Sequence, residues 1–284
     1  MISKTKSESL THNVRILSNS CKVYFGQCLQ TVLIYRSALI IFLLSEAFAY
    51  AGFITFWYKA AQSNPNSKTY TPMGLVLYFS LALFHHSIQH HAASRDIGSD
   101  IRLGKLSYAI IRPFPFLLQA LLRSVAFTIT YIILLSPLLI VTLAAIPSLG
   151  DQLYSVIDST NFQHYLAALT IGLLCGWFIR LVVGLLAFDM AQIWGPDTFL
   201  IALYYAASGA VYPIDLLPGW ALALAKWTPL YYMVGFPVLT LMGRIPHSEF
   251  TTECVRGCVV TFATFSLMIF MWRRGIKRFE AIGI

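Results

Sequence analysis

The chain has 284 residues, of which 57% are hydrophobic and only 11% are charged, whereas an ordinary soluble domain carries roughly 25% charged residues. This composition excludes a soluble two-domain enzyme and a disordered chain, and it makes the net charge of +8 the anchoring charge of a membrane protein rather than a nucleic-acid interface. We therefore expect an all-α membrane protein with a single domain over residues 1–284 and no nucleic-acid partner.

Residues 11–35 show the spacing of an amphipathic helix. Apolar side chains recur there at steps of three or four, at Val14, Leu17, Cys21, Tyr24, Cys28 and Val32. Arg15, Ser18 and Lys22 occupy the opposite face, which is typical of a helix that lies in the membrane interface. A cytosolic helix that packs on a partner protein is the alternative. Charges interrupt the apolar runs of residues 1–30, so we expect no signal peptide.

Five stretches are long and apolar enough for a membrane-spanning helix, which needs about 20 residues. They are residues 36–58, 73–91, 116–146, 165–188 and 251–272. A sixth stretch, residues 198–212, is shorter and ends at Pro213. The third stretch exceeds the thickness of the hydrocarbon core, so it must tilt or extend past the bilayer.

The basic residues are concentrated in residues 1–36, 93–113 and 273–278, which hold 13 of the 20 Lys and Arg. Because cytoplasmic segments are rich in Lys and Arg, we expect both termini and the 93–113 loop to be cytoplasmic, which requires an even number of spans. A seventh span over residues 216–242 would break this rule, and Pro and Gly interrupt that stretch. We therefore expect six spans, with residues 213–243 forming a re-entrant hairpin on the outer side.

The loop that follows the second predicted span is first charged and then amphipathic, and it ends at Pro113 and Pro115. A short amphipathic helix between two spans is a natural docking element for a soluble partner. Residues 98–106 look like a phosphate-binding loop, but they have five residues rather than four between the glycines, and no hydroxyl follows the lysine. We therefore expect no ATPase site in this chain.

Three segments carry a resemblance to a known family. Residues 100–113 read Asp-Ile-Arg-Leu-Gly-Lys-Leu-Ser…Ile-Arg-Pro, residues 208–218 read Ser-Gly…Pro…Leu-Pro, and residues 273–283 read Arg-Arg-Gly-Ile-Lys-Arg-Phe-Glu-Ala-Ile-Gly. In this order, and over nearly the whole chain, they resemble the cytoplasmic loop, the end of the fifth span and the tail of permease subunits of type-two ATP-binding-cassette (ABC) exporters. The resemblance is to a bacterial branch of similar length.

The resemblance implies six spans, an interfacial elbow helix, an outward re-entrant hairpin and a place in the bacterial inner membrane. It also implies a second permease, identical or homologous, and two separate cytosolic ATPase subunits that hold ATP and Mg. The chain itself would bind no cofactor or metal and would not be an enzyme. Its function would be the export of an unknown substrate, and a path of mixed aromatic and polar residues suits an amphipathic or lipid-like one.

The same resemblance assigns roles to residues of the loop and of the hairpin. The loop helix over residues 94–112 would couple the chain to the ATPase. The coupling residues would be Arg95, Asp96, Asp100, Ile101, Arg102, Gly104, Leu106, Arg112 and Pro113. The residues that shape the re-entrant hairpin would be Gly209, Pro213 and Pro218.

Polar side chains within the predicted spans are candidates for the wall of a translocation path. They are Glu46, Arg180, Tyr204, Tyr205, Ser208 and Tyr212. Charges inside a membrane usually face the protein interior and pair, and the depths along the helices allow Glu46 to pair with Arg180 or with Arg123. A purely structural ion pair is the alternative reading of the charges, and aromatic packing is the alternative for the tyrosines.

Four histidines, His85, His86, His90 and His91, lie just before the cytoplasmic loop. His86 and His90 have the spacing of a metal pair, but a site needs at least a third ligand, so we expect no metal. An intramembrane lipid-modifying enzyme that uses this histidine region is the first alternative function. A self-contained secondary transporter is the second, although the two halves of the chain show no internal symmetry.

Small residues form a stripe at steps of four in the fourth predicted span, at Gly172, Gly176 and Gly184, with Arg180 in the same register. Glycines at this spacing let two helices approach closely. The stripe therefore predicts either close packing within the chain or an interface with a second subunit.

Overall fold

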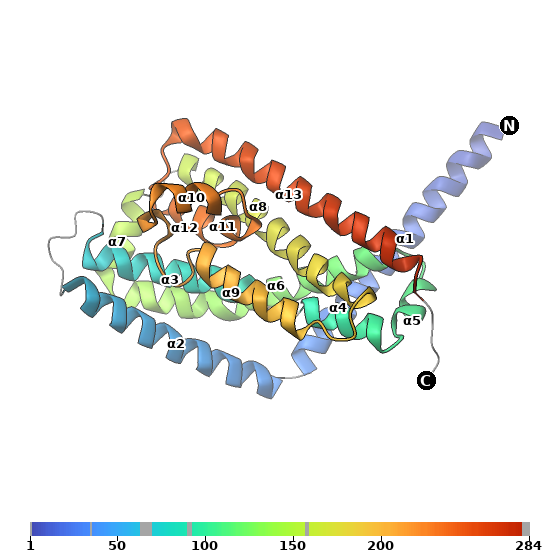
Figure 1. The fold of residues 1–284 in the computed structure, drawn as a ribbon, viewed down its shortest axis with the longest axis horizontal. Coiled ribbons are helices and arrows are strands. Elements are labelled where there is room, and N and C mark those ends of the chain that lie inside the picture. Colours follow the sequence, from blue (N-terminus) through green and yellow to red (C-terminus); the bar gives the residue numbers. More distant parts are fainter. Residues whose placement is uncertain (1, 35, 63–69, 90–92, 157–158, 280–284) are drawn as a thin grey trace.

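The computed structural model describes residues 2–34, 36–62, 70–89, 93–156 and 159–279 (Figure 1). All the regular structure in these ranges is helical, and the ranges contain no strand. In chain order the elements are α1 (Ile2–Ile34), α2 (Arg36–Gln62), α3 (Pro72–Gln89), α4 (Ala93–Arg102), α5 (Leu106–Ile110), α6 (Phe116–Ala145), α7 (Pro147–Val156), α8 (Ser159–Leu185), η1 (Leu186–Phe188), α9 (Trp194–Ala207), η2 (Ile214–Leu216), α10 (Gly219–Ala225), α11 (Pro229–Met233), α12 (Gly235–Leu241) and α13 (His247–Ile276).

Within the described residues, four helices are long and apolar enough to cross a membrane, so the chain is a multi-pass membrane protein. Their spanning parts are Leu39–Ala60, Phe116–Ala145, Thr160–Phe188 and His247–Ile276. The other two predicted spans correspond to α3, with 18 residues, and α9, with 14 residues. The predicted count of six therefore depends on whether these two shorter helices also cross the bilayer.

The N-terminal helix α1 begins at Ile2, well before the predicted residue 11. Its middle part lies against the start of α6, and the ring of Tyr24 makes a T-shaped contact with that of Phe114, just before α6, at a centroid distance of 5.5 Å. The Arg112 guanidinium lies 5.1 Å from the centre of the same Tyr24 ring. These contacts tie α1 to the end of the 94–112 loop, and its position in the membrane interface stays a prediction.

The core of the molecule lies around α3 and α8. Most of α3 is buried, which explains why it is apolar on all sides rather than on one stripe. Helix α8 packs against α13, α11, α12 and α4, and Figure 1 shows α8 and α13 running side by side for much of their length. The largest fully buried side chains include Tyr78, Phe79, Tyr231, Tyr232 and Phe236.

The glycine stripe of α8 packs within the chain. A Cβ atom on Gly172 would collide with the Tyr232 carbonyl oxygen of α11, and one on Gly176 would collide with the Gln89 side chain. A Cβ on Gly184 would lie 2.9 Å from the Cβ of Ile97 in α4. Packing inside the subunit, the first of the two predicted roles, is therefore confirmed for this stripe.

Residues 213–243 do not form one continuous helix. They fold into η2, α10, α11 and α12, which are short helices separated by breaks at Pro218, before Pro229 and at residues 234–235, and proline and glycine are the residues from which the sequence predicts such breaks. Helices α11 and α12 are buried against α8, and α12 also contacts α3. In contrast, α10 exposes Trp220 and Leu224. The segment thus folds back into the bundle, whereas its position in a membrane stays a prediction.

Candidate functional site

The predicted coupling loop forms a helix, a turn and a second short helix. In α4 the buried face consists of Ala93, Ser94, Ile97, Gly98 and Ile101, and this face packs against α8 and η1. The turn to α5 contains Gly104 at a φ of 69°, a conformation that glycine adopts at little cost. The loop is therefore anchored to the bundle by one apolar face, with Leu106 fully buried at the start of α5.

Three polar contacts fasten α4 to two other helices. The carboxylate of Asp100 forms an ion pair with Arg123 of α6 at 2.9 Å. The carboxylate of Asp197, in the first turn of α9, accepts a hydrogen bond of 2.5 Å from Ser94 Oγ and lies 3.3 Å from Arg95 Nε. Nearby, burial raises the pKa of the Asp96 carboxyl above its usual value. A displacement of α4 would therefore pull on both α6 and α9.

Sequence reasoning missed Asp197. An acidic residue in the first turn of a helix is favourable there because of the helix dipole, so the bare sequence offered only that local explanation. The structure gives Asp197 a second role as the partner of Ser94 and Arg95, and only 4% of the residue is exposed. Asp197 therefore joins the loop to α9. Periodicity alone could not show that α9 lies beside α4.

The tip of the loop exposes a group of apolar side chains that the sequence did not single out. Their exposed fractions are 54% for Leu103, 73% for Tyr108, 47% for Ile110 and 80% for Ile111. We call these four residues the loop tip. Arg102, Arg112 and Pro113 are also exposed beside it, so the predicted coupling residues divide into buried anchors and an exposed rim. A cluster of this composition is typical of a protein-binding surface.

The exit from the loop into α6 is fixed by Gln119, another residue that the sequence did not indicate. Its amide nitrogen donates to the carbonyl oxygens of Ala109, at 2.8 Å, and Phe114, at 3.0 Å. Its side-chain oxygen accepts a hydrogen bond of 2.9 Å from Arg112. Arg112 is therefore partly engaged in holding the loop, unlike Arg102.

The predicted ion pairs of Glu46 with Arg180 or Arg123 are wrong. The Glu46 carboxylate instead accepts a hydrogen bond of 2.6 Å from Ser87 Oγ of α3, and Arg123 pairs with Asp100 of α4. Helix depth was the basis of the prediction, but a shared depth does not place two side chains on facing sides of their helices. Glu46, Arg123 and Arg180 therefore do not form one polar cluster.

Three of the predicted path residues lie together. Arg180, Tyr204 and Tyr205 line one small pocket between α8, α9 and α11, together with apolar side chains. Tyr204 is buried and its hydroxyl is hydrogen-bonded to His86 Nδ1 at 3.0 Å, whereas Tyr205 is exposed. Ser208 is fully buried, and its hydroxyl accepts a hydrogen bond from the Ala210 amide. The Tyr212 hydroxyl contacts the Ala206 carbonyl oxygen at the end of α9.

The described histidines have structural contacts. His85 is fully buried, with Nδ1 2.8 Å from the Leu81 carbonyl oxygen and Nε2 3.2 Å from the Tyr165 hydroxyl. His90 and His91 lie outside the described residues. In the part of the chain that the structure describes, no group of three potential metal ligands occurs. With both ring nitrogens of His85 engaged by the fold, these contacts do not favour the histidine-based enzyme.

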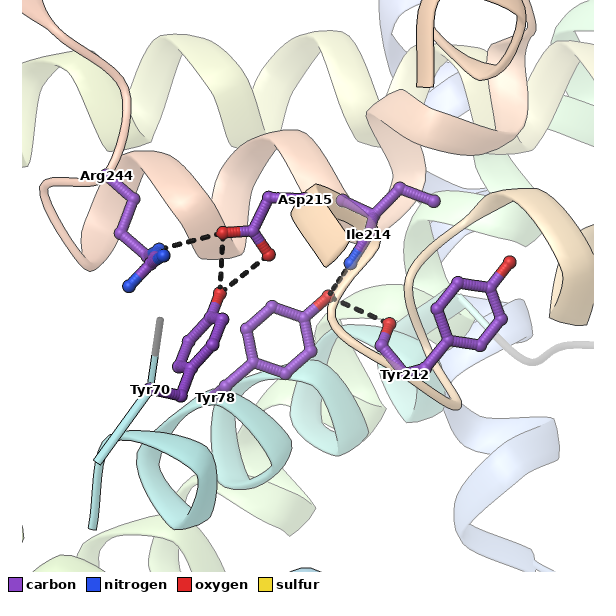
Figure 2. Close-up of polar contacts among 6 residues, drawn as sticks. All are labelled: Tyr70, Tyr78, Tyr212, Ile214, Asp215 and Arg244. Atoms are coloured by element: carbon purple, nitrogen blue, oxygen red, sulfur yellow. Dashed lines mark hydrogen bonds and ion pairs between the residues drawn. The ribbon is translucent and has the colours of Figure 1, made fainter. Parts of the chain in front are cut away.

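A network of tyrosines holds the break after α9 in place (Figure 2). Tyr70 donates a hydrogen bond of 2.8 Å to Asp215, which also pairs with Arg244 at 2.9 Å. The hydroxyl of Tyr78 donates to the Gly209 carbonyl oxygen at 2.8 Å and accepts from the Ile214 amide at 3.3 Å. These contacts tie the 208–215 turn to α3 and to the segment that precedes α13.

We expect Tyr78→Phe to destabilise the protein by about 2 kcal/mol, because it leaves two buried backbone groups without a partner. The change would appear as a lower melting temperature of the detergent-solubilised chain. Tyr108→Phe is the matched control, since Tyr108 is largely exposed and its hydroxyl can bond to water. Equal melting temperatures for the two variants would show that the Tyr78 hydroxyl does not hold the turn.

The comparisons with known proteins give one family match. The family model described as "ABC-2 family transporter protein" matches residues 48–283, which include the 94–112 loop, α8, α9 and the broken segment 213–243. Among curated proteins, no sequence matches the chain. Because the match covers most of the chain, and four helices among the described residues are able to cross a membrane, the protein belongs to the ABC-2 family of transporters and is a membrane permease component of an ABC transporter.

Proposed function

We propose that the chain is the permease half of an ABC exporter, driven by ATP and Mg held in separate cytosolic ATPase subunits. A complete transporter would contain two such subunits and a second permease, identical or homologous. The chain would lie in the bacterial inner membrane with both termini cytoplasmic. The observation that carries the proposal is the 94–112 loop, which is anchored to the bundle on one side and presents the exposed loop tip on the other.

The proposed topology has six spans, because the short helices α3 and α9 are added to the four long ones. Residues 11–35 within α1 would be the interfacial elbow, and residues 213–243 the outward re-entrant hairpin. Helix α3 is shielded by its neighbours rather than exposed to lipid, which supports its place inside a bundle. The buried helices α11 and α12 support the hairpin, since backbone breaks at membrane depth are tolerated where protein covers them.

The proposed mechanism transmits a movement of the ATPase through α4. When ATP closes the ATPase dimer, the loop tip would be displaced, and the Asp100–Arg123 and Asp197 contacts would carry that displacement to α6 and α9. Helix α9 buries only Asp197, Leu200 and Tyr204 of its 14 residues, so most of its surface is not held by the rest of the bundle. A shift of α9 would open the side of the bundle where Arg180, Tyr204 and Tyr205 lie, as part of a shift between two populated states.

The direct test is to purify the tagged full chain from gently solubilised membranes of its own cell and to identify the proteins that accompany it. A stoichiometric ATP-binding-cassette ATPase supports the proposal, and a second, different permease band would indicate a heterodimer. An intact, folded chain that repeatedly carries no ATPase would contradict it.

Charge reversal at the rim of the loop tip should weaken the complex. In the proposed complex Arg102 would face an acidic group of the ATPase. We expect Arg102→Glu to reduce the amount of co-purified ATPase and the stimulation of its activity, because like charges placed together at an interface cost several kcal/mol. Arg273→Glu, at an exposed position near the end of α13, is the control for the change in net charge. Unchanged stimulation in Arg102→Glu would remove Arg102 from the coupling surface.

A further inference from the structure

Arg180 of α8 is a buried cation without a partner in the part of the chain that the structure describes. Only 7% of the residue is exposed. Its Nε atom is buried and makes no hydrogen bond, and none of the ion pairs among the described residues includes this arginine. The guanidinium lines the pocket between α8, α9 and α11.

Two carboxylates of the bundle, Asp197 and Glu46, are engaged by other side chains. The oxygens of Asp197, on the neighbouring helix α9, are engaged by Ser94 and Arg95. Glu46 is engaged by Ser87. Burying a charge without a partner is unfavourable by several kcal/mol, and charges in membrane segments are usually paired. A group from outside this chain that carries negative charge would satisfy the guanidinium.

The surroundings indicate what kind of molecule would bring that charge. Beside Arg180 stand the aromatic rings of Tyr204 and Tyr205. The rest of the pocket wall is apolar and consists of Ile179, Leu200, Ile201, Leu230 and Met233. A cationic head next to an apolar wall is complementary to an amphiphile with an anionic head and an apolar tail.

We propose that Arg180 binds the anionic headgroup of the transported molecule, whose apolar part lies against α9 and α11. The inference rests on the proposed transport function and names the substrate class for the same path. A guanidinium presents several N–H donors in a fixed plane, which suits the oxygens of a phosphate or carboxylate. Arg180 would therefore be a substrate-binding residue and not a structural ion pair.

The pocket is nearly closed in this structure, because its internal volume of about 10 Å³ is room for about one water molecule. A headgroup would enter when α9 moves away from α8. That movement is available because one side of α9 is exposed, including Phe199 and Leu203, and its first turn is attached to the coupling loop through Asp197. Binding at Arg180 would thus be linked to the state of the loop.

The test measures binding to the purified full chain in the neutral detergent dodecyl maltoside. The probes are dodecyl phosphate and dodecyltrimethylammonium, which share one tail and differ in the charge of the head, and inorganic phosphate, which has no tail. Binding is followed by the rise in melting temperature with probe concentration, since a ligand of the folded state stabilises it. The variants are Arg180→Gln and Arg180→Lys, with Arg273→Gln as an exposed control that removes the same charge.

We expect dodecyl phosphate to stabilise the natural chain and Arg273→Gln, and the cationic probe not to do so. Arg180→Gln should bind dodecyl phosphate at least about tenfold more weakly, and Arg180→Lys should retain part of the binding because it keeps the charge. A similar affinity for inorganic phosphate would overturn the amphiphile class and leave a free anion. Equal binding by Arg180→Gln, or no response of the natural chain to dodecyl phosphate, would overturn the proposal.

Two further readouts separate this inference from other roles of Arg180. Removing an unpaired buried charge should leave the melting temperature without probe unchanged or higher, whereas removing a structural ion pair would lower it. If a second permease copy supplied the negative charge, Arg180→Gln would make the detergent-solubilised dimer dissociate, which a lower measured mass would show. The binding of dodecyl phosphate would then be unchanged. None of these measurements needs the ATPase, so the exporter assignment stands or fails separately on co-purification.

Discussion

Gly172→Val is expected to prevent most of the chain from reaching its folded state. The added side chain would enter the space occupied by the Tyr232 carbonyl oxygen, which is part of the α11 backbone and cannot rotate away. Overpacking a close contact typically costs about 1–3 kcal/mol and occasionally more, and here the displaced group is a buried helix that packs along α8. We expect a loss of about 3 kcal/mol, seen as a low yield of monodisperse protein and a lower melting temperature.

Gly52→Val is the matched control for this change. Gly52 also lies in a helix with a membrane-spanning sequence, α2, but a Cβ atom there would meet no other atom within 4 Å. Its yield and melting temperature should remain close to those of the natural chain. If Gly172→Val behaved like Gly52→Val, α11 would not pack on α8, and the folded-back segment 213–243 would need another position.

Features that depend on a short stretch of chain could be predicted from the sequence. The apolar runs predict the long helices, the prolines and glycines predict the breaks between residues 213 and 243, and the two faces of residues 94–112 predict a helical loop. The steps of four at Gly172, Gly176 and Gly184 identified a close contact, since glycine spacing and helix geometry are both local. The sequence did not reveal which helix would fill that contact.

Features that depend on which sides of two helices face each other could not be predicted from the sequence. Glu46 and Arg123 have compatible depths, yet each points to a different neighbour, because depth fixes a position along a helix and not around it. The Asp197 link between α9 and α4 joins residues about a hundred positions apart, and no local pattern indicates it. The unpaired Nε of Arg180 could be recognised only from the folded chain, in which Asp197 and Glu46 are engaged by other side chains.

Ile111→Asp is expected to uncouple the permease from its ATPase without affecting its own fold. Ile111 is 80% exposed at the loop tip, so a carboxylate there would be hydrated in the isolated chain. In the proposed complex the same carboxylate would be buried against the ATPase, at a cost of several kcal/mol for an unpaired charge. Because about 1.4 kcal/mol corresponds to tenfold in affinity, we expect binding to weaken by roughly a hundredfold or more.

The measurement compares the ATPase bound per permease, and the ATPase activity of the purified complex, between this variant and the natural chain. Tyr154→Asp is the control, because Tyr154 is 84% exposed on α7, at the opposite end of the bundle from α5 (Figure 1). An aspartate there should leave both readouts intact. If Ile111→Asp retained them as well, the apolar tip would lie outside the interface, and coupling would have to pass through the charged rim around Arg102. If both variants lost the ATPase, the loss would reflect a general effect of added negative charge rather than contact at the loop tip.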